Sequence, residues 1–381
     1  MHVCIVYDCL YPYTIGGAER WYRNLGERLA AAGHQVTFLT LRQWGRGDRP
    51  SFPGVKVVAV GPRMALYTDS GRRRLLPPVV FGIGVLGHLL RRGGGYDVVH
   101  TASFPYFSLL AAAAVRRRRR FRLVVDWHEA WTQEYWCEYL GPLAGRIGWM
   151  VQRACLRVPQ RAFCFSRLHE RRLQDLGLRG ELTRLEGQYV GPAEPSQPLT
   201  GRPVVVYAGR LIPEKRAAAL VPALARAREE IPDLEGEIYG DGPERESVLR
   251  AIAEFGLEGH VSAPGFVDAE VLERARSTAL CLVLPSSREG YGLVVLEAAA
   301  RGVPVVVVAG PDNAATELVV EGVNGTVASS ARPDDLAAAI VRIHREGPAL
   351  RDSTVDWFRR NAERLSLERS LGIVLDSYAS H

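Results

Sequence analysis

The repeated alternation of apolar, strand-like runs with amphipathic helices constrains the fold of this 381-residue chain more than any other feature. A strand followed by a covering helix, several times over, is the pattern of a doubly wound α/β sheet. In the first half, a helix is expected from about Ala18 to Ala32, where Gly33 ends it. The strands expected around that helix are His2–Tyr7, Gln35–Leu41, Val55–Val60, Val98–His100 and Leu123–Asp126.

A second series of strands begins after a Pro- and Gly-rich segment, Gly187 to Pro203, which is typical of an interdomain linker. Its expected strands are Val204–Ala208, Glu237–Tyr239, one near Val261, Leu280–Leu284 and Val303–Val308. The predicted domains are a first lobe at 1–190, a linker at 191–202, a second lobe at 203–355, and a C-terminal helix within 356–381 that packs back on the first lobe. Parallel sheets bind ligands at the carboxyl ends of their strands, so the site is expected in the cleft between two Rossmann-like lobes.

Composition agrees with two globular lobes, since 47% of the residues are hydrophobic and the chain is too long for one ordinary core. None of the six cysteines forms a C-x-x-C pair, so neither a zinc site nor a disulfide framework is indicated. The chain runs from its first residue into a strand, and no signal peptide is expected. These features predict a cytoplasmic protein.

Charge is divided unevenly along the chain. Basic residues exceed acidic ones by 14 up to Val190, whereas acidic residues are in excess by 8 beyond it. The basic half suggests an anionic partner, namely a phosphate, an acidic membrane surface or a nucleic acid, with a solvated arginine-rich surface as the alternative. The run Arg116–Arg120 is expected to be a solvated turn, because no nucleic-acid-binding motif accompanies it. Only Lys56 and Lys215 are lysines, so a lysine within a motif stands out.

The apolar segment Leu75–Leu90 is shorter than a membrane span and is expected to form a buried or interfacial helix. Within it, Gly82-Ile-Gly84-Val-Leu-Gly87 matches G-x-G-x-x-G, but no strand precedes it and no acidic residue follows at the spacing of a dinucleotide site. We expect these glycines to allow close packing. Because Arg72–Arg74 precede the segment, peripheral contact with a membrane is the alternative to a purely cytoplasmic location.

Two loops contain groups that suit a diphosphate. Ile15-Gly16-Gly17-Ala-Glu19 lies between a strand and a helix, where backbone N–H groups and the helix N-terminus favour a negative charge. Gly209-Arg210-Leu-Ile-Pro-Glu-Lys215 follows the first strand of the second lobe. Its arginine offers a planar fork and its lysine a point charge for phosphate oxygens.

The segment Glu289-Gly290-Tyr291-Gly292-Leu293-Val-Val-Leu-Glu297 is the most specific motif. It places one acid on a loop after a buried strand and a second acid in the first two turns of a helix. Backbone N–H groups near Gly292 and Leu293 would point at a phosphate between the two acids. The segment therefore supplies acceptors for sugar and ribose hydroxyls together with donors for a phosphate.

A fourth constellation, Asp126-Trp127-His128-Glu129-Ala-Trp131, follows a strand of the first lobe. A histidine beside acids at the carboxyl end of a strand suits a site, although a lone histidine is more often structural. The aromatic residues of this region, Trp127, Trp131, Tyr135, Trp136 and Tyr139, are candidates for stacking on sugar rings, with core packing as the alternative.

Together these motifs resemble family 4 of the retaining glycosyltransferases, which have the GT-B fold and use nucleotide sugars. The resemblance covers nearly the whole chain and includes the Gly240-Asp-Gly-Pro243 turn and the Gly265-Phe266-Val267 loop. It implies transfer of a hexose-type sugar to a hydroxyl acceptor, such as a glycoside, a natural product or a cell-envelope glycan, with retention by a same-face displacement.

The resemblance also implies roles for individual residues. Arg210 and Lys215 would hold the donor diphosphate, Glu297 the ribose and Glu289 the transferred sugar, while His128 would touch the sugar near the reacting carbon. The predicted catalytic residues are therefore His128, Arg210, Lys215 and Glu289. The predicted donor-binding residues add Gly16, Gly17, Gly209, Gly240, Gly265, Phe266, Val267, Gly290, Tyr291, Gly292, Leu293 and Glu297, and the predicted acceptor-binding residues are Trp127, Glu129, Trp131 and Tyr135.

Two segments depart from the family pattern: Leu185-Glu-Gly187 stands where an Asn-Gly element is common, and Asp312-Asn-Ala-Ala-Thr316 where a Gly pair is common. The second departure leaves the identity of the sugar open. No D-x-D occurs in the chain, so no metal or other cofactor is expected. The alternatives are a sugar-nucleotide epimerase of the same architecture and a catalytically degenerate nucleotide-sugar-binding protein.

Overall fold

The computed structural model describes residues 1–45, 47–48, 50–68, 71–192 and 203–379, and these residues form two compact units. Among the described residues, unit 1 contains those up to Thr68, Arg72–Glu186 and those from Ser370 to Ala379. Unit 2 contains Gly187–Arg369 together with Gly71. Most of the predicted linker, residues 193–202, lies outside the described residues.

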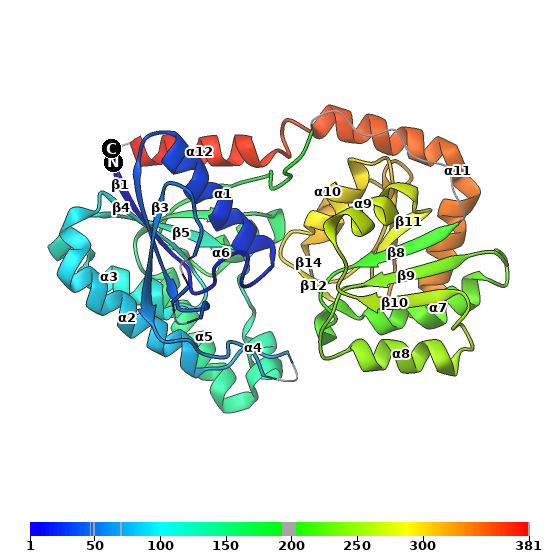
Figure 1. Cartoon of the computed structure of the whole chain (residues 1–381), viewed down its shortest axis with the longest axis horizontal. Coiled ribbons are helices and arrows are strands. Elements are labelled where there is room, and N and C mark those ends of the chain that lie inside the picture. The colour runs from blue at the N-terminus through cyan, green and yellow to red at the C-terminus, as the bar shows by residue number, and fades with distance from the viewer. Residues whose placement is uncertain (46, 49, 69–70, 193–202, 380–381) are drawn as a thin grey trace. The chain divides into compact units, whose positions relative to one another are not determined.

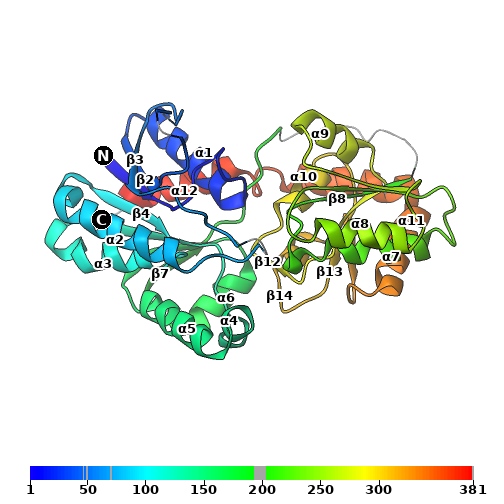
Figure 2. The ribbon, with the colours of Figure 1, turned by 60° about the horizontal axis from the view of Figure 1, so that its bottom comes forward.

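Unit 1 is built on a seven-stranded parallel sheet with the strand order β3-β2-β1-β4-β5-β6-β7 (Figure 1). Its strands are β1 His2–Val6, β2 Gln35–Leu41, β3 Val55–Gly61, β4 Val98–Ala102, β5 Arg122–Trp127, β6 Gln160–Cys164 and β7 Gly180–Arg184. Its helices are α1 Gly17–Ala31, α2 Leu76–Arg92, α3 Phe107–Arg119, α4 Gln133–Leu140, α5 Pro142–Leu156, α6 Arg167–Asp175 and most of α12 Leu367–Ala379. Helices α1 and α12 lie on one face of the sheet, and α2, α3 and α5 lie on the other (Figure 2).

The strands at the centre of this sheet are apolar because helices cover both of their faces. Four of the five residues of β1 and all five of β4 are buried, which matches the expected apolar runs. Strands β6 and β7 were not expected from the sequence. The outermost of them, β7, has the sequence Gly-Glu-Leu-Thr-Arg and no buried residue, so it carries no apolar signal.

Unit 2 contains a six-stranded parallel sheet with the order β10-β9-β8-β11-β13-β15, which places its strands in the same 3-2-1-4-5-6 arrangement as the first six of unit 1. The strands are β8 Val204–Ala208, β9 Glu235–Tyr239, β10 Val261–Gly265, β11 Cys281–Leu284, β13 Val305–Val308 and β15 Gly325–Ala328. A separate short pair joins β12 Arg288–Glu289 to β14 Asp312–Asn313. The helices are α7 Leu220–Ala227, α8 Arg245–Glu254, α9 Ala269–Thr278, α10 Leu293–Ala299 and α11 Pro333–Asn361, with a 3₁₀ turn, η4, at Ala314–Leu318.

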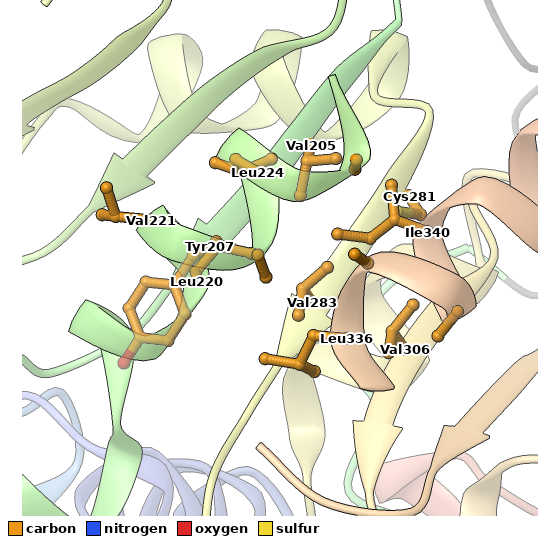
Figure 3. Packing of buried hydrophobic residues seen from close by; sticks show 14 of the residues in the cluster. Val205, Tyr207, Leu220, Val221, Leu224, Cys281, Val283, Val306, Leu336 and Ile340 are labelled. Atoms are coloured by element: carbon orange, nitrogen blue, oxygen red, sulfur yellow. The ribbon is translucent and has the colours of Figure 1, made fainter. Parts of the chain in front are cut away.

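The core of unit 2 lies between one face of this sheet and helices α7 and α11 (Figure 3). Alternate strand residues point to the same face, and Val205 with Tyr207 on β8 and Val283 on β11 are fully buried there. Leu220 on α7 and Leu336 on α11 cover them and have no exposed surface. Burying each such side chain contributes about 1.5–3 kcal/mol, so the carboxyl ends of the strands rest on a rigid support.

Two sequence expectations have clear outcomes in unit 1. A Cβ would lie 2.4 Å from the Cβ of Phe107 at Gly82 and 1.9 Å from the carbonyl oxygen of Val60 at Gly84, so close packing is confirmed for these two glycines of the G-x-G-x-x-G segment but not for Gly87, where a Cβ would meet nothing within 4 Å. The expectation of a turn at Arg116–Arg120 was wrong, because residues 116–119 form the last turn of α3 and only Arg120, with φ of 61°, turns the chain.

Of the helices that the structure describes, none has the length and apolar character needed to span a bilayer.

Candidate active site

The loops after β8 and β9 of unit 2 form one continuous surface at the carboxyl edge of the sheet. The Leu211 N–H donates to the carbonyl of Asp241 (2.9 Å), and the Gly209 N–H donates to the carbonyl of Tyr239 (3.1 Å). Gly240 has φ of +130°, and a Cβ there would lie 1.8 Å from the carbonyl oxygen of Gly209. Only glycine fits this position. The conformation of the Gly209-Arg210 loop therefore depends on the Gly240-Asp-Gly-Pro turn that packs against it, and that of the turn depends on the loop.

Lys215 and Glu289, two of the predicted catalytic residues, form an ion pair between Nζ and Oε1 although they are 74 positions apart. Their side chains are 18% and 10% exposed. The Ser286 hydroxyl donates to the same carboxylate oxygen at 2.8 Å. Arg210 lies exposed on the same loop as Lys215, where the Tyr207 hydroxyl donates to its carbonyl at 2.9 Å. A preformed pair of opposite charges thus lies beside an exposed arginine.

Asn313 holds the segment that carries Glu289, and sequence analysis missed it. The β12–β14 pair places the two residues opposite each other. The side chain of Asn313 is buried, donates to the carbonyls of Ser286 (3.1 Å) and Val308 (2.8 Å), and accepts from the N–H of Ala315 (3.1 Å). The segment that departs from the family pattern is therefore a structural support. The sequence shows only an asparagine in a loop, and asparagine is common in turns because its side chain hydrogen-bonds to the backbone nearby.

Gly292, with φ of +97°, precedes α10. A Cβ on it would lie 2.6 Å from the Cβ of Ala315, so the glycine permits close contact with η4. Tyr291 is buried, whereas Gly290 and Leu293 are partly exposed on either side. These residues lie where the sequence predicted donor contacts, and their contacts to a ligand stay a prediction.

Glu297, predicted to bind a ribose, forms an ion pair with Arg276 of α9. The two side chains are 18% and 11% exposed. A second pair, between Arg301 and Glu273, lies next to it, and the Arg301 guanidinium donates to the Glu297 carbonyl. Sequence analysis missed Arg276 because nothing local to Glu297 indicates a partner 21 positions earlier.

The Gly265-Phe266-Val267 loop follows β10. Gly265 has φ of +93°, and its carbonyl accepts from the N–H of Gly240 at 2.9 Å, so this loop adjoins the glycine turn after β9. Phe266 is 73% exposed, an unusual exposure for a phenylalanine, while Val267 is partly exposed. The side chain is available to a planar ligand such as a base.

In unit 1, the Gly16-Gly17 loop leads into α1. A Cβ on Gly16 would lie 2.4 Å from Oε2 of Glu19, so a buried carboxylate already occupies this side of the helix N-terminus. Gly17 is exposed, and a Cβ there would meet nothing within 4 Å. The open side of the loop is therefore at Gly17.

His128 follows β5 and stacks on Phe165 with a centroid distance of 4.7 Å and an interplanar angle of 2°. The ring of Tyr22 packs against His128 in a T-shaped arrangement at a centroid distance of 5.8 Å. Burial lowers the pKa of His128, against the opposing influence of Asp126, which favours a neutral imidazole. Its Nε2 is buried and has no hydrogen-bond partner among the described residues. A neutral ring with an unused nitrogen suits hydrogen bonding to a ligand hydroxyl.

Asp126 belongs to the structure beneath His128. It has no exposed surface, and its carboxylate contacts Nε2 of His100 at 2.8 Å and accepts from the Trp21 indole at 2.7 Å. His100 in turn bonds to the Tyr378 hydroxyl of α12 through Nδ1. Burial raises the pKa of Asp126, but its contacts with His100 and Trp21 outweigh burial and lower it. The aspartate therefore joins three elements of unit 1.

The aromatic residues predicted to bind an acceptor have different surroundings. Trp127 has no exposed surface and donates to Oε1 of Gln160 at 2.9 Å, so the expectation that it stacks on a ligand was wrong and it is a core residue. Trp131 and Tyr135 are partly exposed and pack edge to face at 4.8 Å. Glu129 accepts from the Trp131 indole at 2.7 Å, which orients that ring.

A buried ion pair between Asp8 and Arg73 was missed from the sequence. Two contacts, at 3.0 and 3.1 Å, join the guanidinium to the fully buried carboxylate that follows β1. The same guanidinium lies over the rings of Tyr67 (5.0 Å) and Phe104 (5.4 Å). Arg73 therefore points into unit 1, whereas its neighbours Arg72 and Arg74 are exposed, and the three do not form one basic surface.

Comparison with known proteins identifies the family. Residues 16–185 match the family described as "Glycosyl transferase 4-like domain", and residues 193–357 match "Glycosyl transferases group 1". This chain belongs to the family 4 type of glycosyltransferases. Its two Rossmann-like lobes are those of the GT-B fold.

Individual glycosyltransferases resemble the chain over different extents. It is 36% identical over 149 residues to a GDP-mannose-dependent α-(1-6)-phosphatidylinositol monomannoside mannosyltransferase of Mycolicibacterium smegmatis, but this match covers 37% of the chain and 38% of that enzyme. It is 28% identical over 364 residues to glycogen synthase of Mycobacterium tuberculosis, covering 89% of the chain and 84% of that enzyme. The sucrose-phosphate synthase structure from Thermosynechococcus elongatus has a TM-score of 0.80 over 99% of this chain and 98% of that one, at 21% identity, which shows the fold.

Proposed function

We propose that this glycosyltransferase moves a hexose-type sugar from a nucleoside-diphosphate sugar to a hydroxyl acceptor, with retention of configuration. The observation that carries the proposal is the Lys215–Glu289 ion pair beside the exposed Arg210 at the carboxyl edge of the unit 2 sheet. A cation for the leaving diphosphate and a carboxylate for sugar hydroxyls are already in contact there. The relatives named above are transferases, which gives no support to the epimerase alternative.

The proposed mechanism begins with an exchange of partners. A donor diphosphate brings negative charge to Arg210 and Lys215, and Lys215 turns from Glu289 to the phosphate oxygens. Glu289 then accepts hydrogen bonds from hydroxyls of the transferred sugar, with Ser286 still donating to it. Positive charge at the departing diphosphate stabilises the transition state, the kind of contribution whose loss costs about two to three orders of magnitude in turnover.

Other residues take roles in holding the donor. Glu297, oriented by Arg276, would accept from the ribose hydroxyls. Phe266 would lie along the base, and the N–H groups near Gly292 would face a phosphate oxygen. In unit 1, Gly17 would approach the diphosphate.

We propose that unit 1 binds the acceptor, with Glu129, Trp131 and Tyr135 as its contacts. Partly exposed aromatic rings, of which that of Trp131 is oriented by a hydrogen bond to Glu129, suit a sugar-bearing or other ring-containing acceptor. His128, neutral and with an unused Nε2, would accept or donate one hydrogen bond near the reacting carbon. The proposal assigns this reaction to the cytoplasm and keeps contact with a membrane periphery as the alternative.

No metal is proposed at the diphosphate. Arg210 and Lys215 supply the positive charge there, and no D-x-D is present to hold a divalent ion. Activity should therefore persist in excess EDTA. A strict requirement for Mg²⁺ or Mn²⁺ would contradict this part of the proposal.

A thermal-shift panel of UDP, GDP, ADP and dTDP, with their sugars, tests the function and identifies the donor. The correct nucleotide should raise the melting temperature, and Lys215→Ala should remove most of the rise. Arg250→Ala, which removes an exposed cation from α8 of the same unit, is the matched control and should keep it. Release of sugar to water or to an acceptor from the stabilising donor then separates an enzyme from a binding-only protein. No response to any nucleotide would refute the proposal.

A further inference from the structure

A large cavity lies in unit 1 at the opposite edge of the sheet from the motifs described above. Its volume is about 1320 Å³, and its lining includes the residues that begin the first three strands, His2, Gln35 and Val55. The donor and acceptor residues follow the carboxyl ends of strands. This cavity is therefore separate from the proposed reaction site.

The cavity exists because helix α2 diverges from the edge strand β3. At Gly84 the two elements touch, since a Cβ there would lie 1.9 Å from the Val60 carbonyl oxygen. One turn later, a Cβ on Gly87 would meet nothing within 4 Å, and both glycines line the cavity. The space is thus a consequence of the backbone path.

Three cations from two elements line this space: Lys56 from β3, and Arg91 and Arg92 from the last turn of α2. None of the lining residues is Asp or Glu, and none of the three cations has an ion pair with a described residue. Lys56 is one of only two lysines in the chain. Three exposed cations beside a pocket that no carboxylate lines favour an anion.

The lining has apolar and polar parts. Val58, Val60 and Ile83 are among its apolar residues from β3 and α2, and Ile83 is 66% exposed. Among the polar lining residues, Nε2 of His88 bonds to the Tyr96 hydroxyl at 2.7 Å. Burial, followed by the charges of Arg92 and Lys56, lowers the pKa of His88, so both cations lie near this ring.

We propose that this cavity binds an amphiphilic organic phosphate, with the phosphate held by Lys56, Arg91 and Arg92 and the apolar part against Ile83 and its neighbours. Two arginine forks and an ammonium group suit the oxygens of a phosphate monoester. The volume far exceeds what an inorganic ion needs and leaves room for an organic ligand. Both a lipid headgroup and a water-soluble phosphate ester have this chemistry.

Calorimetric titration of the full chain with octyl phosphate tests the proposal, with octyl glucoside as the uncharged probe and inorganic phosphate as the probe without a tail. Octyl phosphate should bind most tightly. Lys56→Ala should weaken its binding about tenfold, as expected for one charge-assisted hydrogen bond. Gly87→Leu, which fills open space, should abolish it.

Two control variants keep the result specific. Arg118→Ala removes an exposed cation on α3 outside the cavity and should leave binding unchanged. Lys215→Ala should also leave it unchanged, which excludes the donor site. If Gly87→Leu fails to fold, the Lys56→Ala result and a shift of the His88 ring signals in NMR spectra on titration decide. Equal binding of octyl glucoside, or binding that Lys56→Ala leaves unaltered, would overturn the proposal.

Vesicle flotation distinguishes the two sources. Co-flotation with phosphatidylcholine vesicles that contain phosphatidic acid, lost in Lys56→Ala, would identify a membrane lipid as the ligand. Binding of octyl phosphate without flotation would identify a soluble phosphate ester. Flotation that persists in both Lys56→Ala and Gly87→Leu, in the absence of octyl phosphate binding, would show that the cavity is not the site.

Discussion

Replacing Glu289 with glutamine should tighten the binding of a free nucleoside diphosphate while it lowers turnover with the sugar donor. Glu289 pairs with Lys215, so a diphosphate must compete with the carboxylate for that cation. Glutamine has nearly the same shape and can keep the hydrogen bond from Ser286. The substitution therefore frees Lys215 without opening a cavity.

The expected size of this effect follows from the exposure of the pair. Its side chains are 18% and 10% exposed, so the pair is screened less than a surface pair but is not fully desolvated. Without the ion pair, nucleoside diphosphate binding no longer has to break it, so the binding free energy should improve by about 1 kcal/mol, the upper end for exposed pairs. This corresponds to about a fivefold lower Kd for the nucleoside diphosphate. Turnover should fall because the neutral amide binds the sugar hydroxyls more weakly than a carboxylate.

Calorimetry with UDP and GDP on four proteins measures this coupling: the wild type, Glu289→Gln, Lys215→Ala and the double variant. Lys215→Ala should weaken binding about 10- to 100-fold, and Glu289→Gln should have no further effect in that background. Glu254→Gln removes an exposed negative charge from α8 and controls for long-range attraction. The partner exchange is refuted if Glu289→Gln leaves Kd unchanged, or if the same gain occurs in Glu254→Gln or without Lys215.

Three further predictions follow from the site. Glu297→Gln should weaken nucleotide binding about tenfold and leave turnover at saturation nearly unchanged, since a ribose contact is made in ground and transition states alike. Steady-state kinetics that show an equal loss in kcat would contradict this role. Asn313→Ala removes three hydrogen bonds to buried backbone groups, so the unfolding free energy should fall by about 2–4 kcal/mol and activity should decline with it, whereas an unaltered denaturation midpoint would mean that the segment is held otherwise. Burial lowers the pKa of His128 below its ordinary value of 6.5, so below about pH 6.5 the unfolded chain takes up a proton that the folded chain does not, and stability is lost as the pH falls. Between pH 7 and 5, the melting temperature of His128→Gln should therefore decline less than that of the wild type. Parallel declines in the two proteins would disprove this linkage.

Much of the fold could be predicted because its determinants are local. The strand Gln35–Leu41 has the predicted limits, and α1 begins and ends one residue before its predicted limits. A central strand covered on both faces must be apolar, so its own residues identify it. Strand β7 could not be found in this way, since it lies at the edge and none of its residues is buried.

The glycines show what local sequence can indicate about a site. Gly240 and Gly292 both have positive φ, and both lie in motifs that their own residue pattern identifies. The pattern indicated that the backbone turns sharply there. The neighbours that exclude a side chain, Gly209 and Ala315, became known only from the fold, because they lie far away in the sequence.

The sequence by itself determined the two α/β lobes, the family and the loops that carry Arg210, Lys215, Glu289 and Glu297, because strand patterns and short motifs depend on residues close together in the chain. Only the tertiary structure decided the partners of those residues and which aromatic rings are exposed. Tryptophan has the same apolar character at 127 and 131, yet one ring is fully buried and the other partly exposed. Burial depends on how distant segments pack against one another, and neither exposure nor charge pairing is encoded in any short stretch of the chain.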